Sequence, residues 1–444
     1  MALLVRLERW LPAVCGIAWW LVFYPGFFGE DSLINLGEAR SGTISVLFTA
    51  WWVYLVHFIS FGTRAIPLLT LVSVVGLQYA VYLWVTTVFP KGGPRAITVL
   101  LISASPLTGA MGIQVRHDVA MTSGLLLCAA VLTRTWLNGD RWRWRDLALL
   151  ALAAPAVATR HNGLPTLLAA AALCLLVFRT RRWRQAAALA AVAAGAAIVT
   201  YGATRASGHS NSVDPMQTVE WLMADISCVL TKEAVEPTAA EWDVLTRIAS
   251  RTDWPHERAC RFMNPILVAP TFKPDAVAPN YRELIGVWLS IGARYPGRML
   301  GAHAMRVRLF LPPFATGVPS NDLMPFLHST ILPNDFGLEW AFPRVANPAR
   351  TMVRAWNALR LVLANAALWL LVLIAVAWQM PAYRPKLFPT LLIAAALELG
   401  LLVTAPISEG RYGLLILVCG QSTALFVLME WILVRSDSST GRLS

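Results

Sequence analysis

The sequence predicts an all-α polytopic membrane protein. Of its 444 residues, 57% are hydrophobic and only 14% are charged, whereas about a quarter of the residues of a soluble domain are charged. Long apolar runs recur along the chain, separated by short polar loops. The 19 tryptophans, many of them beside arginines or at the ends of these runs, are typical of an interfacial aromatic belt. We therefore expect about 10 transmembrane helices, juxtamembrane helices in the first outer loop and a mostly helical outer domain.

Ten apolar runs are candidate spans. A membrane-crossing helix needs about 20 residues, and somewhat fewer where protein shelters it. No Ala-x-Ala-type cleavage site follows the first run, so we expect that run to be a retained anchor. The predicted spans lie near 10–28, 66–89, 96–112, 119–134, 146–159, 163–178, 185–204, 356–378, 388–404 and 412–434.

The basic residues predict the orientation of these spans. With the N-terminus inside, the Arg-rich segments 141–145 and 179–184 face the cytoplasm, as the positive-inside rule requires. The net charge of +12 is distributed as a topology signal, so we expect a lipid bilayer and no nucleic acid as partner. Abundant Ala, Arg, Trp and Pro suggest a bacterial inner (cytoplasmic) membrane. The short outer loops hold few arginines, and these need a separate explanation: Arg64, Arg116, Arg160 and Arg411.

The chain divides into three parts on this scheme. Residues 1–204 form an N-terminal membrane module with seven spans and a first outer loop at 29–65. Residues 205–355 form the hydrophilic, mostly helical outer domain, in which Thr238 opens a capping box, Asn280 is expected to cap a helix, and 311–350 is expected to be ordered loop. Residues 356–444 form a C-terminal module with three spans.

The first outer loop contains two further helical candidates. Residues 33–40 form a short amphipathic pattern at the membrane surface. Residues 48–61 form an interfacial helix, a re-entrant segment or an eleventh span. An eleventh span would place the Arg-rich loops outside, so the charge pattern argues against it.

Six cysteines are present. Cys15, Cys128, Cys174 and Cys419 lie in apolar runs and are expected to be packing residues. Cys228 and Cys260 are the only two in the outer domain, where disulfides can form, and we predict that they pair. No Cys-x-x-Cys or His-rich spacing indicates a structural metal.

Two adjacent carboxylates, Glu30 and Asp31, follow the first span directly. The Pro25-Gly26 and Phe28-Gly29 steps stop the incoming helix, so the acidic pair begins a loop at the membrane surface. Ionised acids survive there mainly where they face protein or a water-filled cavity. We interpret Asp31 as a catalytic candidate, although Asp31-Ser32 is also a favourable start for a helix.

Four polar clusters are predicted at the outer ends of different spans. They are Glu30-Asp31, Arg116-His117-Asp118, Arg160-His161-Asn162 and Glu409-Gly410-Arg411-Tyr412. Arginine binds phosphate with its planar fork and can stabilise the charge on a departing phosphate, while a carboxylate can deprotonate an acceptor hydroxyl. The combination indicates group transfer from a lipid phosphate. The sequence contains no Gly-x-Ser-x-Gly elbow and no Gly-rich phosphate loop.

Two polar positions elsewhere allow two interpretations each. Glu398 falls within the ninth predicted span, where it bonds a neighbouring helix or reaches the donor site through an arginine. Arg306 and Arg308 contact substrate or lipid headgroups, or form a solvated basic face.

These motifs resemble a bacterial branch of the GT-C superfamily of membrane glycosyltransferases. The branch shows a Pro-Gly…Asp-Ser loop, a (Lys/His)-Asp-Val motif, an Arg-x-Asn-(Gly/Ala) motif and a late Arg-Tyr. The corresponding segments here are Tyr24-Pro25-Gly26 with Asp31-Ser32, Arg116-His117-Asp118-Val119, Arg160-His161-Asn162-Gly163 and Arg411-Tyr412.

The resemblance implies transfer of a sugar from a polyprenyl-phosphate donor to a glycan, lipid or protein acceptor on the periplasmic or extracellular face, with inversion. Asp31 is then the general base, with Glu30 as the alternative, and Asp118 is a second carboxylate that assists positioning. The resemblance also implies a role for the remaining polar residues. Arg160, Arg411 and Arg116 would bind the donor phosphate, and the substrate-binding residues would be His57, His117, His161, Asn162, Glu409 and Tyr412.

A divalent metal is possible in this superfamily, but we predict no cofactor, because Asp31 and Asp118 alone are few ligands for one. Two other functions remain open. An O-antigen ligase or polymerase also uses outer arginines and a polyprenyl-linked donor, although its key residues lie in a late outer loop. A transporter or flippase of a lipid-linked substrate would show internal repeats and charges near the midplane, which this sequence lacks.

Overall fold

We describe the protein from a computed structural model, in which residues 2–44, 50–178, 183–208, 215–231, 235–260, 265–307, 331, 334–404 and 413–440 are described. The described residues form helices and no strand, and two isolated bridges pair Phe27 with Gln114 and Phe28 with Ile331. The chain divides into two compact units. The first contains residues 1–210, 324–398 and 411–444, and the second contains residues 211–323 and 399–410.

Five helices of the described chain are long and apolar enough to cross a membrane, which makes this a multi-pass helical membrane protein. They are α5 (Ile66–Val88), α8 (His117–Leu137), α11 (Trp183–Ala206), and most of α19 (Arg384–Thr404) and α20 (Leu414–Thr440). A sixth span is formed if α6 (Gly93–Ala104) and α7 (Pro106–Gly112) count as one, although they are bent by 44°. Pro106 explains the bend, because it disfavours a helical conformation at Ser105, which is extended (φ −73°, ψ 149°).

The remaining predicted spans contain shorter helices. These are α2 (Leu11–Val22), α9 (Trp144–Val157), α10 (Gly163–Phe178) and α18 (Ala366–Gln379), while α1 (Ala2–Leu7) precedes them. The span predicted at 356–378 is interrupted, because α16 (Pro343–Ala358) and α17 (Arg360–Leu363) come before α18. Asn365 begins α18 by accepting a hydrogen bond from the Leu368 amide at 2.9 Å, an N-cap that the hydropathy pattern does not reveal.

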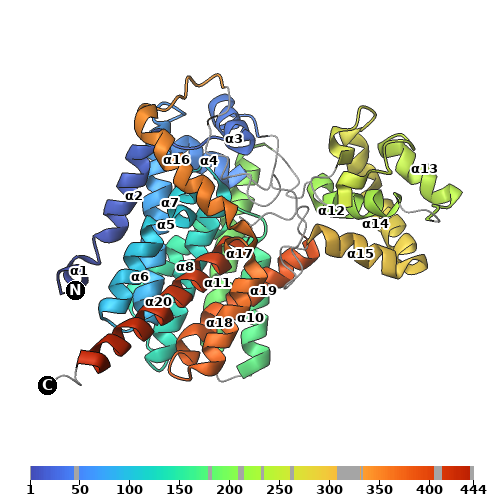
Figure 1. Cartoon of the computed structure of the whole chain (residues 1–444). Coiled ribbons are helices and arrows are strands. Elements are labelled where there is room, and N and C mark those ends of the chain that lie inside the picture. Colours follow the sequence, from blue (N-terminus) through green and yellow to red (C-terminus); the bar gives the residue numbers. More distant parts are fainter. Residues whose placement is uncertain are drawn as a thin grey trace. The chain divides into compact units, whose positions relative to one another are not determined.

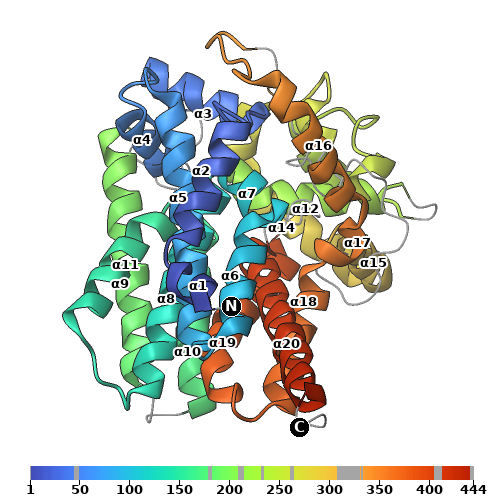
Figure 2. The ribbon, with the colours of Figure 1, turned by 60° about the vertical axis from the view of Figure 1, so that its left-hand side comes forward.

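The helices of the first unit form a bundle (Figures 1 and 2). Helix α5 packs on α2 and α8, α9 packs between α8 and α11, and α20 packs on α6 and α18. Two short helices, α3 (Glu30–Ser41) and α4 (Ala50–Ile59), pack together at one end of the bundle, whereas α20 ends at the other. At about 1.5 Å per residue, the ten residues of α4 measure roughly 15 Å, which is about half the hydrocarbon thickness of a bilayer.

Helix α16 corrects one expectation. Part of 311–350 is expected to be loop, but α16 begins at Pro343 and packs against α2 and α7 of the first unit. By their contacts, residues 324–355 group with the first unit and not with residues 211–323. The apolar residues Ala346 and Val353 are buried on this helix, which accounts for its packing on the bundle.

The second unit has its own hydrophobic core. It contains α12 (Pro215–Val229), α13 (Ala239–Ile248), α14 (Pro274–Arg294), α15 (Pro296–Arg306) and the 3-10 turns η3 (Glu257–Cys260) and η4 (Pro265–Val268). The fully buried Trp254 lies in this core and donates from its indole N–H to the Leu245 carbonyl at 2.9 Å. A disulfide joins Cys228 to Cys260, the pair expected from the sequence, and Cys15, Cys128 and Cys419 are free thiols.

The capping predictions in this unit differ in outcome. The capping box is confirmed, because the Thr238 hydroxyl accepts from the Glu241 amide at 3.2 Å and the Glu241 carboxylate accepts from the Thr238 amide at 2.7 Å. The expected cap at Asn280 is wrong. Helix α14 begins earlier, at Pro274, where proline suits the first helical turn, and the Asn280 side chain instead accepts from Arg247 at 2.7 Å.

Candidate functional site

The loop between α2 and α3 is held in place from several sides. Its backbone runs beside the segment before α8, where the Phe27 amide donates to the Ile113 carbonyl at 3.3 Å. The Thr70 hydroxyl of α5 donates to the Pro25 carbonyl at 2.6 Å. On another side, the Trp340 indole N–H donates to the Gly26 carbonyl at 3.3 Å. These contacts fix the start of α3, and with it Asp31, relative to α5 and α8.

Gly26 is required at this crossing. Its φ is +137°, which L side chains rarely adopt, and a Cβ there would lie 2.7 Å from both the Ile113 carbonyl oxygen and Thr70 Cγ2. The backbones can approach this closely only because residue 26 has no side chain. The Pro-Gly step expected from the sequence to stop a helix therefore also brings the first loop against the second.

Asp31 forms an ion pair with Arg116 beside this close approach of the two loops. Gly29, with extended backbone, precedes the first residue of α3, so Asp31 is the second residue of the helix and not its cap. Asp31 Oδ2 lies 3.0 Å from the Arg116 guanidinium. The Asp31 side chain is 42% exposed, whereas that of Arg116 is 8% exposed. The helix start thus presents an accessible carboxylate beside a cation that is itself almost enclosed.

Asp118 and Arg160 form a second ion pair, and it is buried. The Asp118 side chain is 0% exposed and that of Arg160 is 6% exposed. His117 joins them, with Nε2 at 3.0 Å from Arg160 and 3.8 Å from Asp118 Oδ2. The Thr159 hydroxyl donates to the His117 carbonyl at 3.0 Å, so the end of α9 is tied to the start of α8. Because Asp118 is enclosed, its carboxylate is not accessible from the surface, and its contacts are with Arg160 and His117.

The structure thus brings three of the four predicted clusters into two linked ion pairs. Arg116 and Asp118 are separated by one residue, so the start of α8 contributes one partner to each pair. Asn162 and His161 follow Arg160 at the start of α10, and the Asn162 carbonyl accepts from the Thr166 hydroxyl at 2.7 Å. The backbone of Glu30 is described as the first residue of α3, but its side chain is not. The fourth cluster, Glu409, Arg411 and Tyr412, lies outside the described residues.

His57 has a structural contact. Its Nδ1 lies 2.7 Å from the carbonyl oxygen of Ala39, which links α4 to α3. The contact between His57 and a substrate stays a prediction. Through α3, however, His57 supports the helix that carries Asp31.

Arg306 is not part of a solvated basic face. Its side chain is fully buried in the second unit, where it donates to Asp225 Oδ1 at 2.5 Å and to the Trp221 carbonyl at 2.9 Å. His303 Nδ1 lies 3.1 Å from Asp225 Oδ2, and the Trp288 indole N–H donates to the same oxygen at 3.1 Å. This network joins α12, α14 and α15. The sequence does not predict the role of Asp225, because an isolated acid among apolar residues has no recognisable motif. Arg308 lies outside the described residues.

Glu398 is buried in α19, and neither carboxylate oxygen has a hydrogen-bond partner among the described residues. The expected bond to a neighbouring helix is therefore not found in the described part of the chain. Its contact with donor-binding groups stays a prediction.

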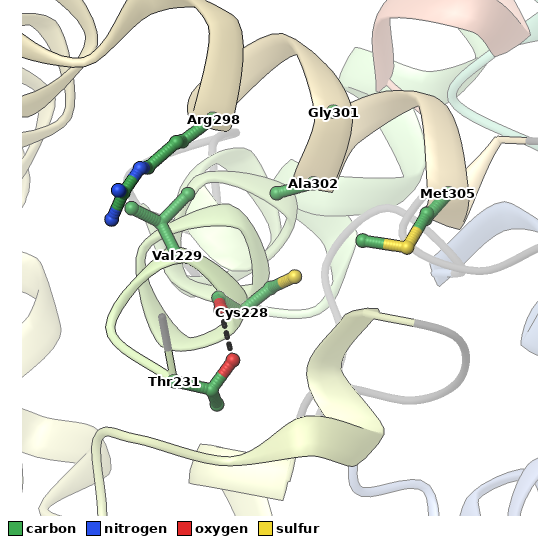
Figure 3. Close-up of a pocket in the computed structure, with 7 residues that line it drawn as sticks. All are labelled: Cys228, Val229, Thr231, Arg298, Gly301, Ala302 and Met305. Atoms are coloured by element: carbon green, nitrogen blue, oxygen red, sulfur yellow. Dashed lines mark hydrogen bonds between the residues drawn. The ribbon is translucent and has the colours of Figure 1, made fainter. Parts of the chain in front are cut away.

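A pocket of about 540 Å³ lies in the second unit beside the disulfide, between the end of α12 and α15 (Figure 3). Arg298 and Met305 mark its two ends, and Val229 and Ala302 form its apolar walls. The described residues of its lining include one charged side chain, Arg298.

No group of three or more His, Cys, Asp or Glu residues in the described chain could hold a metal ion. Comparison with protein-family models, with curated proteins and with solved structures finds no match to this chain.

Proposed function

We propose that this protein is an inverting membrane glycosyltransferase that moves a sugar from a polyprenyl-phosphate donor to an envelope glycan, lipid or protein acceptor. The observation that carries this proposal is the pairing of the exposed Asp31 with Arg116 at 3.0 Å, next to the buried Asp118–Arg160 pair. A carboxylate that is reachable and arginines that are pre-oriented are the two requirements for group transfer from a phosphate.

Asp31 is the general base in this proposal. Its carboxylate removes the proton of the acceptor hydroxyl while that oxygen forms a bond to the anomeric carbon of the sugar. The bond from the anomeric carbon to the phosphate oxygen breaks, and its electron pair leaves with polyprenyl phosphate. Attack from the face opposite the phosphate inverts the anomeric centre.

The arginines stabilise the departing phosphate. Arg116 forms an ion pair with Asp31 at 3.0 Å and adds positive charge at the same place. Arg160 is oriented by Asp118 and by His117, so Asp118 is a positioning residue in this scheme. Arg411 is assigned to the same phosphate because of the Arg411-Tyr412 motif in the sequence. We assign Glu30 as the alternative base.

The membrane arrangement proposed with this chemistry has ten spans in a bacterial inner membrane and an active site on the periplasmic face. Two short helices, α3 and α4, follow the first apolar helix, and a separate helical unit follows α11. Both features agree with what the GT-C resemblance implies. The Arg-rich segments 141–145 and 179–184 support the proposed orientation.

The test uses full-length protein in liposomes with a panel of polyprenyl-monophosphate sugars carrying a radiolabel and membrane extract as acceptor. We expect protein-dependent movement of label from lipid to acceptor, with release of polyprenyl phosphate. Transfer from diphosphate-linked oligosaccharides alone would identify a ligase or polymerase instead. Translocation of labelled lipid with no transfer would identify a flippase, and either result contradicts the proposal.

A further inference from the structure

A groove of about 640 Å³ lies between α9 and α11 of the membrane unit. Small side chains make room for it, since Ala151 of α9 and Ala187, Ala188 and Ala191 of α11 line it. At Gly195 the two helices pack tightly, because a Cβ there would lie 3.1 Å from the Ala154 Cβ. The groove is therefore built into the packing of these two helices.

The groove is long enough for a lipid chain. Its lining on α11 extends from Arg184 to Val199, which is roughly 22 Å at about 1.5 Å per residue. One leaflet contributes about 15 Å to the hydrocarbon core of a bilayer. Because α11 is one of the candidate spans, the groove lies at the depth of the lipid tails.

One end of the groove is basic. Arg184 lines it, Arg141 and Arg143 precede α9, and Arg145 lies in the first turn of α9. All four are exposed, and none forms an ion pair with a described residue.

The acidic residues near this end are already bound. Asp146 accepts from Arg134 at 2.9 Å and from the Arg143 amide at 3.0 Å, and Asp140 accepts from the Gln185 side chain. Because Asp146 is paired with Arg134, the four arginines exceed the one remaining described carboxylate at this end, Asp140. Trp142, a residue type that prefers the membrane interface, lines the groove at the same end.

We propose that this groove binds an anionic phospholipid, with one acyl chain along α9 and α11 and the headgroup phosphate at Arg184. The groove wall is apolar between its ends, so a chain that fills it loses no hydrogen bonds. Basic pockets between spans are suited to anionic headgroups, and a guanidinium can bind phosphate through two parallel hydrogen bonds. This site does not depend on the proposed glycosyl transfer.

The test is native mass spectrometry of the detergent-solubilised full chain, titrated with phosphatidylglycerol or with phosphatidylethanolamine of the same chains. We expect phosphatidylglycerol to bind at least tenfold more tightly. Ala191→Phe should weaken that binding at least tenfold, whereas Ala194→Phe, at an exposed position of α11 outside the groove, should leave it unchanged. Should Ala191→Phe fail to fold, Ala151→Leu blocks the groove from α9.

The headgroup is tested separately. Arg184→Gln should reduce phosphatidylglycerol binding to the level of phosphatidylethanolamine, and Arg205→Gln, at the other end of α11, should not. Unchanged binding in a folded groove-blocking variant would show that the lipid binds elsewhere. Equal binding of both lipids by the wild-type protein would overturn the assignment of an anionic headgroup.

Discussion

Asp118 and Arg160, 42 residues apart in the sequence, form an ion pair from which solvent is almost wholly excluded. Each lies near a helix end, Asp118 in the first turn of α8 and Arg160 in the short segment after α9. The pair therefore ties the start of α8 to the segment after α9, beside Arg116, which contacts Asp31 of α3. Removing one charge leaves the other buried without compensation.

Asp118→Asn should lower the free energy of unfolding by about 3–5 kcal/mol, because the Arg160 charge stays buried and unpaired. Thermal unfolding in detergent, followed by size-exclusion chromatography, measures the change. The control is Asp243→Asn, which breaks an exposed ion pair with Arg247 and should cost about 0.5 kcal/mol or less. The double variant Asp118→Asn/Arg160→Gln should recover part of the loss. Equal stability of Asp118→Asn and wild type would contradict the burial of this pair.

Gly26→Ala should destabilise the protein and abolish activity, because the new Cβ meets the Ile113 carbonyl and Thr70 at 2.7 Å and the backbone is at positive φ. The matched control is Gly37→Ala within α3, where a Cβ has nothing within 4 Å. That change should raise stability by up to about 1 kcal/mol, since alanine is the better helix former. The same unfolding measurement compares the two. Stabilisation by both substitutions would show that the first loop is not held against α5 and α8.

The disulfide should stabilise the second unit. It closes a segment with a sequence separation of 32, and its removal in Cys228→Ala/Cys260→Ala should cost about 2–4 kcal/mol. A reducing agent should lower the unfolding temperature of the wild type but not that of the double variant. Peptide mapping without reduction checks the pairing directly, and alkylation of both cysteines in the non-reduced protein would disprove it.

Much of this arrangement could be predicted from the sequence, and particular residues show where such prediction stops. Hydropathy and charge locate the polar clusters at helix ends, so the proximity of Asp31 to the segment containing Arg116 and Asp118 follows from topology. The sequence does not predict which arginine pairs with which carboxylate. Arg116 and Arg160 are equally plausible partners of Asp31 and of Asp118 until the close approach of the two loops at Gly26 is known.

Burial is the second property that the linear pattern hides. Asp31 and Asp118 are both acids at the starts of helices, yet one is 42% exposed and the other is enclosed. The difference arises from tertiary packing, because α9 packs on α8 and the segment after α9 brings Arg160 to Asp118. Tertiary packing also explains Arg306. The sequence predicts that it contacts a substrate, a lipid headgroup or solvent, whereas in the structure it is buried beside Asp225 and His303. The N-cap of α18 at Asn365 is not predicted from the sequence, because apolar residues continue on both sides of it.

The most direct test of the central claim is the turnover of Asp31→Asn in the reconstituted transfer assay, measured as kcat/KM with a polyprenyl-phosphate sugar. General base catalysis contributes about 10²–10⁴-fold, so we expect a loss of at least 10²-fold with unchanged folding. Asp275→Asn, at an exposed carboxylate of the second unit, is the control and should retain full activity. Loss of activity in Glu30→Gln alone would move the base by one residue. Full activity of folded Asp31→Asn would contradict the account.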